Sequence, residues 1–217
     1  MKKVKTCYLC GELIKKNLSF DHVPPKQFYA SIYRNKLKLN LTTLPTHISC
    51  NVGYKHDEDY FFHSLAPISM NTKSGSAAWL DIIKASKHEE SKGLIKKVLK
   101  EFTHRPYGQI YLPNGLIAKN IEGERIKRVI WKITRGLFFI EYDEFLSEQV
   151  VHAIEFYDHY TKPSEEFKYV RDTESKGKYP GVFDYKVITT DDYAMWGMLF
   201  WDYFIAFVVH KRPNYKL

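Results

Sequence analysis

The sequence predicts an α+β protein with a small first module, residues 1–65, and an α+β body with an antiparallel sheet, residues 66–217. Three observations lead to this prediction. The first segment has little apolar mass and holds all the cysteines, whereas apolar residues recur at helical spacing over 76–102 and 124–137. The last third is rich in short runs of β-branched and aromatic residues, which favour strands. A chain of 217 residues suffices for one core with a small accessory module.

The helical segments of the body differ in charge. Residues 76–102 are interrupted near Gly93, which predicts a helix pair or one broken helix. Residues 124–137 form an amphipathic helix with basic side chains on much of the remaining circumference. These are Arg125, Lys127, Arg128, Lys132 and Arg135. Such a helix either packs on the core with a solvated outer face or lies along a nucleic-acid backbone, and the sequence favours neither.

Strands are predicted in two places. Residues 108–118 put Asn114-Gly115 between apolar runs, which predicts a hairpin. An antiparallel sheet is expected from four segments: 150–157, 182–188, 195–201 and 204–209. The last two meet at a tight turn, Trp201-Asp202-Tyr203. The polar stretch 160–180, with glycine and proline, is expected to be a long loop.

Charge and hydropathy narrow the class of protein. The 33 basic and 25 acidic residues give a net charge of +8, which modestly favours a polyanionic partner. A hydrophobic content of 44% excludes a disordered chain. The basic N-terminus is followed by no apolar segment, so a cytoplasmic location is expected. The apolar stretch 193–209 is short for a membrane span and contains Asp202, so no membrane partner is expected.

Three cysteines and one histidine have the spacing of a metal site. Cys7 and Cys10 form a Cys-x2-Cys pair followed by Gly11, which lets two thiolates on a tight turn bind one zinc ion. His47 and Cys50 repeat the spacing with an imidazole in place of one thiolate. Together they predict a closed, tetrahedral structural Zn²⁺ site. The alternative is that the first pair are chance neighbours and Cys50 is a small buried hydrophobe.

An Asp-His-Val-Pro-Pro motif lies between the two halves of this site. A proline biases the residue before it toward extended backbone, so Asp21 and His22 are expected at a strand end with side chains on opposite faces. Histidine can act as a general base near neutral pH, and a carboxylate is a hard ligand for a divalent cation. Taken alone, the motif is also typical of a capped turn before a helix.

Asn51 and Lys55 directly follow the second half of the site. Zinc ligation there would start a helix with both side chains on one face. The Asn51 amide oxygen suits Mg²⁺ or Mn²⁺, and the Lys55 ammonium suits a substrate phosphate. Four residues further along are alternative metal ligands, although they more often form a solvated helix face. They are His56, Asp57, Glu58 and His63.

This combination resembles the HNH, or ββα-metal, endonucleases that have a Cys-x2-Cys zinc frame around the active site. The matching segments are CYLCG, FDHVPPKQF, LTTLPTHISCN and YKHDEDYF. The resemblance implies a ββα-metal fold for residues 1–65. It implies that His22 is the general base and that Asp21 and Asn51 bind the catalytic Mg²⁺ or Mn²⁺.

Two positions depart from the family pattern. His47 stands where the family usually has cysteine, which would weaken zinc affinity or make it more sensitive to pH. The middle asparagine of the family motif is replaced by Thr42 or Thr43, so its role is left unassigned.

The leading hypothesis is a cytoplasmic HNH endonuclease that hydrolyses phosphodiester bonds of DNA, with restriction or antiphage defence suggested by the family's habits. A second hypothesis is a non-catalytic zinc-binding module that recognises nucleic acid or a protein. A third is a toxin-like nuclease controlled by an inhibitor protein. A homodimer would suit double-strand cleavage, and a regulatory protein partner would suit the toxin.

Overall fold

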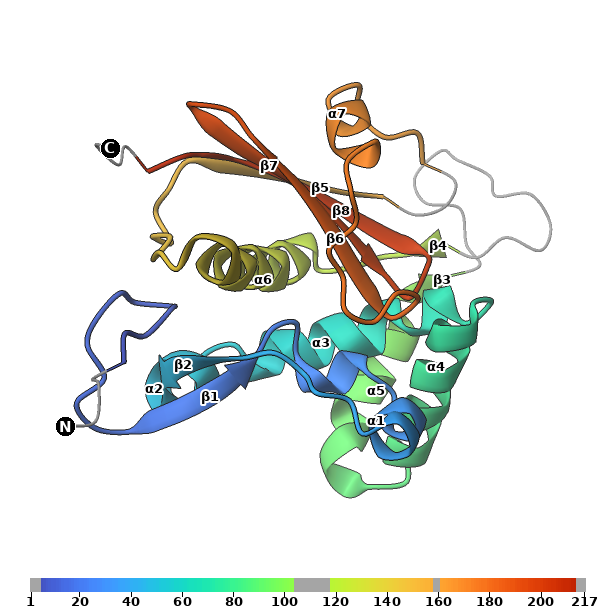
Figure 1. Ribbon diagram of the computed structural model, residues 1–217. Helices are drawn as coiled ribbons and strands as arrows, with labels where there is room; N and C mark the ends of the chain where they lie inside the picture. Colours follow the sequence, from blue (N-terminus) through green and yellow to red (C-terminus); the bar gives the residue numbers. More distant parts are fainter. Residues whose placement is uncertain (1–4, 104–117, 158–160, 214–217) are drawn as a thin grey trace.

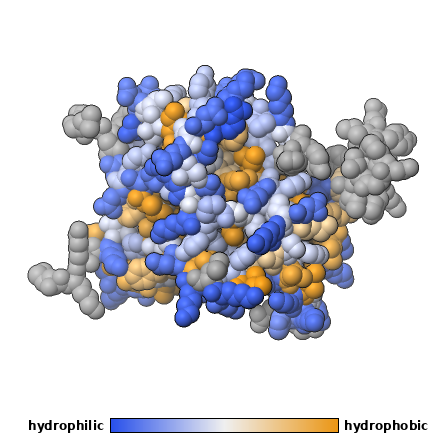
Figure 2. Space-filling model, turned by 45° about the vertical axis from the view of Figure 1, so that its right-hand side comes forward, coloured by the Kyte–Doolittle hydropathy of each residue, from blue (hydrophilic) through white to orange (hydrophobic). Residues whose placement is uncertain are grey.

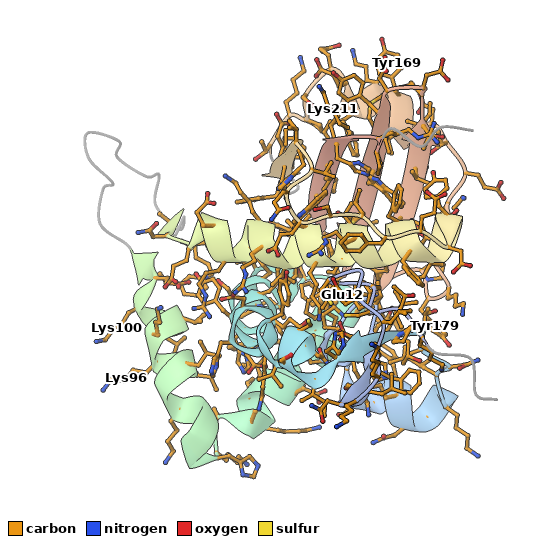
Figure 3. All side chains as sticks on the ribbon, turned by 90° about the vertical axis from the view of Figure 1, so that its left-hand side faces the viewer. Glu12, Lys96, Lys100, Tyr169, Tyr179 and Lys211 are labelled. Atoms are coloured by element: carbon orange, nitrogen blue, oxygen red, sulfur yellow. The ribbon has the colours of Figure 1, made fainter. Side chains whose placement is uncertain are left out.

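The computed structural model describes residues 5–103, 118–157 and 161–213. Within them, helices and strands are mixed and a larger antiparallel sheet is present, as predicted. The long helix α6 lies between this sheet and the N-terminal elements (Figures 1 and 3). None of the described helices is long and apolar enough to cross a membrane.

The N-terminal part is a strand pair surrounded by helices. Its elements are β1 (Leu18–His22), η1 (Lys26–Phe28), α1 (Ser31–Leu37), β2 (Thr43–His47), α2 (Ile48–Val52), α3 (Lys55–Leu65), η2 (Pro67–Ser69), α4 (Lys73–Ala85) and α5 (Glu89–Lys100). β1 and β2 pair antiparallel, with His22 opposite Thr43 and Leu18 opposite His47. The Asp-His pair therefore ends a strand, as predicted.

The predicted helix pair over 76–102 is confirmed as α4 and α5, but its break is not near Gly93. The chain turns between Ala85 and Glu89, where the backbone N–H of His88 donates to Ala85. Gly93 lies inside α5, and nothing lies within 4 Å of where its Cβ would be. A glycine in an open helical position lowers helix stability without ending the helix.

The C-terminal part contains α6 and a four-stranded sheet. Its elements are β3 (Phe102–Thr103), β4 (Ala118–Lys119), α6 (Gly123–Tyr142), β5 (His152–Tyr157), α7 (Phe167–Arg171), β6 (Phe183–Thr189), β7 (Tyr193–Phe200) and β8 (Phe204–Lys211). The sheet order is β5-β8-β7-β6, and all neighbours are antiparallel. This confirms the predicted strands and the turn at Trp201-Asp202.

The stretch 160–180 is not entirely loop, because it contains α7. Phe167 and Val170, one helical turn apart, pack with Phe207 of the sheet. A Cβ on Gly197 would lie 3.0 Å from Val170, so this small residue allows α7 to lie close on β7. Tertiary packing thus stabilises a helix too short to be stable alone. The predicted hairpin at 108–118 falls almost wholly outside the described residues.

One main hydrophobic core joins the N-terminal part, α6 and the sheet. Phe28 and Phe61 stack with ring centroids 4.9 Å apart, and Trp201 donates a 2.9 Å hydrogen bond to the Phe28 carbonyl. The surface in Figure 2 is mostly hydrophilic, with hydrophobic side chains in several separate areas. The division of the chain at residue 65 stays a prediction, and packing across it is extensive.

Helix α6 lies close to the chain just after β1 at Gly136. A Cβ there would lie 2.7 Å from Cγ2 of Val23, the residue that follows the Asp-His pair. We expect Gly136→Ala to lower the free energy of unfolding by about 1–3 kcal/mol through overpacking, despite the higher helix propensity of alanine. Chemical denaturation measures this. Gly93→Ala is the matched control and should raise the free energy of unfolding. If both variants were more stable than the wild type, the close contact between Gly136 and Val23 would be contradicted.

Candidate metal centre and adjoining cleft

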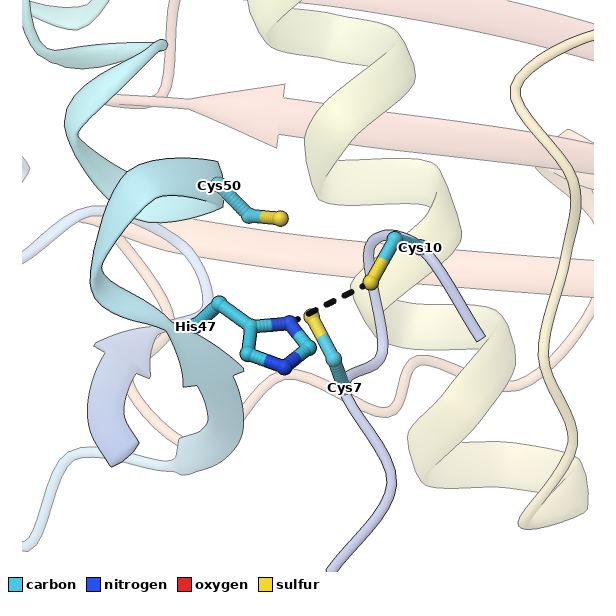
Figure 4. A group of neighbouring side chains, drawn as sticks. All are labelled: Cys7, Cys10, His47 and Cys50. Atoms are coloured by element: carbon cyan, nitrogen blue, oxygen red, sulfur yellow. Dashed lines mark hydrogen bonds between the residues drawn. The ribbon is translucent and has the colours of Figure 1, made fainter. Parts of the chain in front are cut away.

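The four predicted zinc ligands lie together (Figure 4). Their ligand atoms are all within 4.8 Å of one another, and Cys10 Sγ is 3.3 Å from His47 Nδ1. Sulfur and nitrogen ligands around a tetrahedral zinc ion are separated by about 3.5–3.8 Å. The cluster of Cys7, Cys10, His47 and Cys50 can therefore hold a metal ion such as zinc, with the imidazole binding through Nδ1.

The turn that carries Cys7 is held in place by α6. The backbone N–H of Gly11 donates to the Cys7 carbonyl at 2.9 Å, and Gly11 has a φ of +77° that favours glycine. A Cβ there would lie 3.0 Å from the ring of Phe145. Arg135, which is 1% exposed, donates to the carbonyl of Leu9 inside the turn. The other two ligands come from the junction of β2 and α2, so the cluster ties this junction to the turn.

The cysteines differ in protonation. Burial raises the pKa of the Cys7 thiol, but hydrogen bonds from the Thr46 hydroxyl and from backbone amides outweigh it and lower the pKa to about 6. Burial and the neighbouring thiols raise the pKa of Cys50 to about 12, and burial raises that of Cys10. Because zinc binds thiolates, its binding releases protons from the latter two thiols and becomes stronger as the pH rises.

A cleft of about 240 Å³ lies against α2, the helix that carries Cys50. It is lined by Phe20, Asp21, His22, Pro25, Lys26, Gln27, Asn51, Val52, Lys55 and Glu58. The structure thus brings the four residues predicted for catalysis and phosphate binding to one cleft. Their roles stay predictions.

Asn51 and Lys55 reach the cleft from two helices, not from one as predicted. Asn51 belongs to α2 and Lys55 begins α3. Tyr54, which lies between the two helices, is buried. Its ring lies 4.5 Å from the Arg128 guanidinium, and its hydroxyl accepts a 3.3 Å hydrogen bond from Arg135. The two side chains nevertheless share the cleft.

His22 is half-buried at the cleft. Burial and the Lys26 ammonium lower its pKa from the usual 6.5, outweighing the opposite effect of Asp21. The imidazole is therefore neutral at pH 7 and able to accept a proton.

Asp21 is buried, with its carboxylate in a network of polar side chains. Its Oδ2 atom accepts a hydrogen bond from the Tyr8 hydroxyl and lies 2.6 Å from Lys132 Nζ. Lys132, 1% exposed, also pairs with Glu58. Burial raises the pKa of Tyr8 well above 10, so this hydroxyl stays a donor. Since Tyr8 lies between Cys7 and Cys10, the network connects the metal cluster with the cleft.

Sequence reasoning missed part of this network. Glu58 was only an alternative ligand, and Tyr8 carried no signal. The spacing of Lys55 and Glu58, one helical turn apart, is the signal that places both on one face of α3. Within the described part of the chain, Glu58 is the one of the four alternative ligands that lines the cleft. Asp57, in contrast, forms an ion pair with Arg125 at 2.7 Å.

The predicted basic helix, 124–137, makes up most of α6, starting at its second residue, and only part of its basic side is solvated. Lys132 and Arg135 are each 1% exposed, so the expectation of an outward position is wrong for both. Arg125 and Arg128 both pair with Asp57. Arg125, Arg128 and Lys132 thus pair with carboxylates of the protein itself, and Arg135 donates to backbone carbonyls. Contact of this helix with nucleic acid stays a prediction.

Comparison of this chain with known proteins found no similar protein. No family model matches the chain, and neither the curated proteins nor the solved structures contain a match. Function therefore has to be inferred from the metal cluster and the cleft.

Proposed function

We propose that the protein is a metal-dependent HNH-type endonuclease that hydrolyses phosphodiester bonds, with DNA as the substrate. The observation that carries this is the meeting of His22, Asp21, Asn51 and Lys55 in one cleft beside a cluster suited to zinc. The order β1, β2, α2 supports a ββα-metal module. The four segments that resemble HNH enzymes contain these same residues, and their order along the chain agrees with the proposal.

The residues of the cleft suit the divalent cation that such an enzyme needs. Carboxylate and amide oxygens, here from Asp21 and Asn51, are the hard ligands preferred by Mg²⁺ and Mn²⁺. Among the described residues, the contacts of Tyr8 and Lys132 both fall on Oδ2 of Asp21, which leaves Oδ1 for a cation. When bound, the cation stabilises negative charge on the phosphate and on the leaving oxygen.

The other cleft residues supply the base and hold the substrate. A neutral His22 imidazole takes a proton from water, whose oxygen then attacks phosphorus. The P–O bond to the leaving sugar breaks, and that oxygen takes a proton from solvent. Lys55 pairs with a phosphate oxygen as a point charge. The zinc cluster takes no part in these steps, and its role is to hold the β2–α2 junction.

Cleavage of supercoiled plasmid tests the proposal. Zinc-loaded protein is expected to nick the plasmid when Mg²⁺ or Mn²⁺ is added and to leave it intact without them. A chelator alone is an unsuitable control because it also removes zinc, so the matched control is zinc-loaded protein in buffer without Mg²⁺. Uncut DNA and RNA in the presence of both cations, with folded zinc-loaded protein, would contradict the proposal.

One observation favours a second candidate, a non-catalytic zinc-binding module that recognises nucleic acid or a protein. Asp21 already has a buried cationic partner in Lys132, as a purely structural carboxylate would. This alternative predicts that zinc-loaded protein retards DNA in a gel shift, cuts none, and binds it equally after His22→Ala.

A further inference from the structure

Two carboxylates at the cleft share one buried ammonium. Lys132 Nζ pairs with Asp21 from β1 and with Glu58 from α3. Two acceptors of one ammonium lie at most about 5 Å apart. The side chains of Asp21 and Glu58 are 7% and 12% exposed, and both residues line the cleft. Two carboxylates from different elements are thus held close together at the edge of a solvent-reachable space.

The charges of this group do not cancel. Two carboxylates and one ammonium leave one net negative charge, and Tyr8 contributes a hydroxyl donor. Oxygen ligands of Mg²⁺ or Mn²⁺ lie about 2.1 Å from the ion and about 3 Å from one another, so a small displacement would bring both carboxylates to one cation. Such a cation would lie within a few ångströms of the lysine and be repelled by it.

We propose that Glu58 is a second carboxylate ligand of the cleft's divalent cation, and that the buried ammonium of Lys132 competes with this cation for Asp21 and Glu58. This inference rests on the proposed function, because the proposed function is what requires a cation in the cleft. It goes further by naming a ligand outside the Asp-His pair and a buried charge that sets the affinity. Lys132 itself does not line the cleft.

Titration of zinc-loaded, full-length protein with Mn²⁺ tests this, with free Mn²⁺ followed by electron paramagnetic resonance. Lys132→Met removes the competing charge at similar volume and is expected to tighten Mn²⁺ binding at least about tenfold. Glu58→Gln removes one carboxylate and is expected to weaken it by a similar factor. Lys168→Met, which breaks the surface pair with Glu165, is the matched control and should change nothing.

A second measurement covers the stability of the variants. Lys132→Met leaves two carboxylates without their counter-ion, so Mn²⁺ should raise its melting temperature more than that of the wild type. If Lys132→Met does not fold, the Mn²⁺ affinity of Glu58→Gln tests the proposal. Equal Mn²⁺ affinity in folded Lys132→Met and wild type, or unchanged affinity in Glu58→Gln, would overturn the proposal.

These titrations contain no nucleic acid, so their result does not depend on whether the protein cleaves plasmid. Mn²⁺-dependent nicking together with unchanged affinities in the variants would leave the nuclease standing and overturn the role of Lys132. Shifted affinities in a protein that cuts no nucleic acid would support the role of Lys132 and contradict the nuclease.

Discussion

Substitution of His22 by alanine is expected to lower the rate of plasmid nicking by about 100- to 10,000-fold, the usual contribution of a general base. Burial and Lys26 keep the imidazole neutral at pH 7, so it is ready to accept a proton from water. Alanine removes the acceptor but leaves the zinc ligands and the proposed cation ligands in place. Zinc content and melting temperature should therefore stay near those of the wild type. The rate is measured with supercoiled plasmid at saturating Mg²⁺.

The pH profile of the wild type gives a second readout of the same base. Because its pKa lies below the usual 6.5, the nicking rate should stay level down to that pH and fall only under more acidic conditions. His88→Ala, at an exposed position before α5, serves as the control and should match the wild type. Full activity of His22→Ala would remove this residue from the mechanism, even if the protein remained a nuclease.

Replacing Cys50 with serine is expected to abolish zinc binding and to lower the free energy of unfolding by more than about 4 kcal/mol, the range reached when a bound metal is lost. The cluster ties the turn of Cys7 and Cys10 to the β2–α2 junction, and metal-binding energy acts there as folding energy. Elemental analysis measures the zinc content, and thermal melting with and without added zinc measures the stability.

The neighbouring residue provides a matched control for this variant. Ser49 is exposed in the same short helix, so Ser49→Ala should keep both zinc and stability. If Cys50→Ser retained full zinc content and an unchanged melting temperature, the four residues would not form a zinc site. The proximity of their ligand atoms would then be a feature of packing.

The grouping of Cys7, Cys10, His47 and Cys50, and most helices and strands, were predicted from the sequence alone. Three kinds of local pattern carried this prediction: two Cys-x2-Cys-like pairs, runs of β-branched and aromatic residues over 182–188 and 204–209, and 3.6-residue spacing over 124–137. Backbone geometry places residues at such spacings on one face of a strand, one face of a helix or one turn, so these patterns can be interpreted without knowing what packs against them. For the same reason Asp21 and His22 were placed at a strand end, and the structure puts them there.

Only the tertiary structure decided where the buried charges find their partners. In sequence, Lys132 and Arg135 look like any cations on the polar side of an amphipathic helix. In the folded chain they contact Asp21, Glu58 and the carbonyl of Leu9, all of them distant along the chain. A buried charge is tolerated where an opposite charge or an acceptor meets it. Which residues meet is a property of packing between elements, and no spacing within one element encodes it.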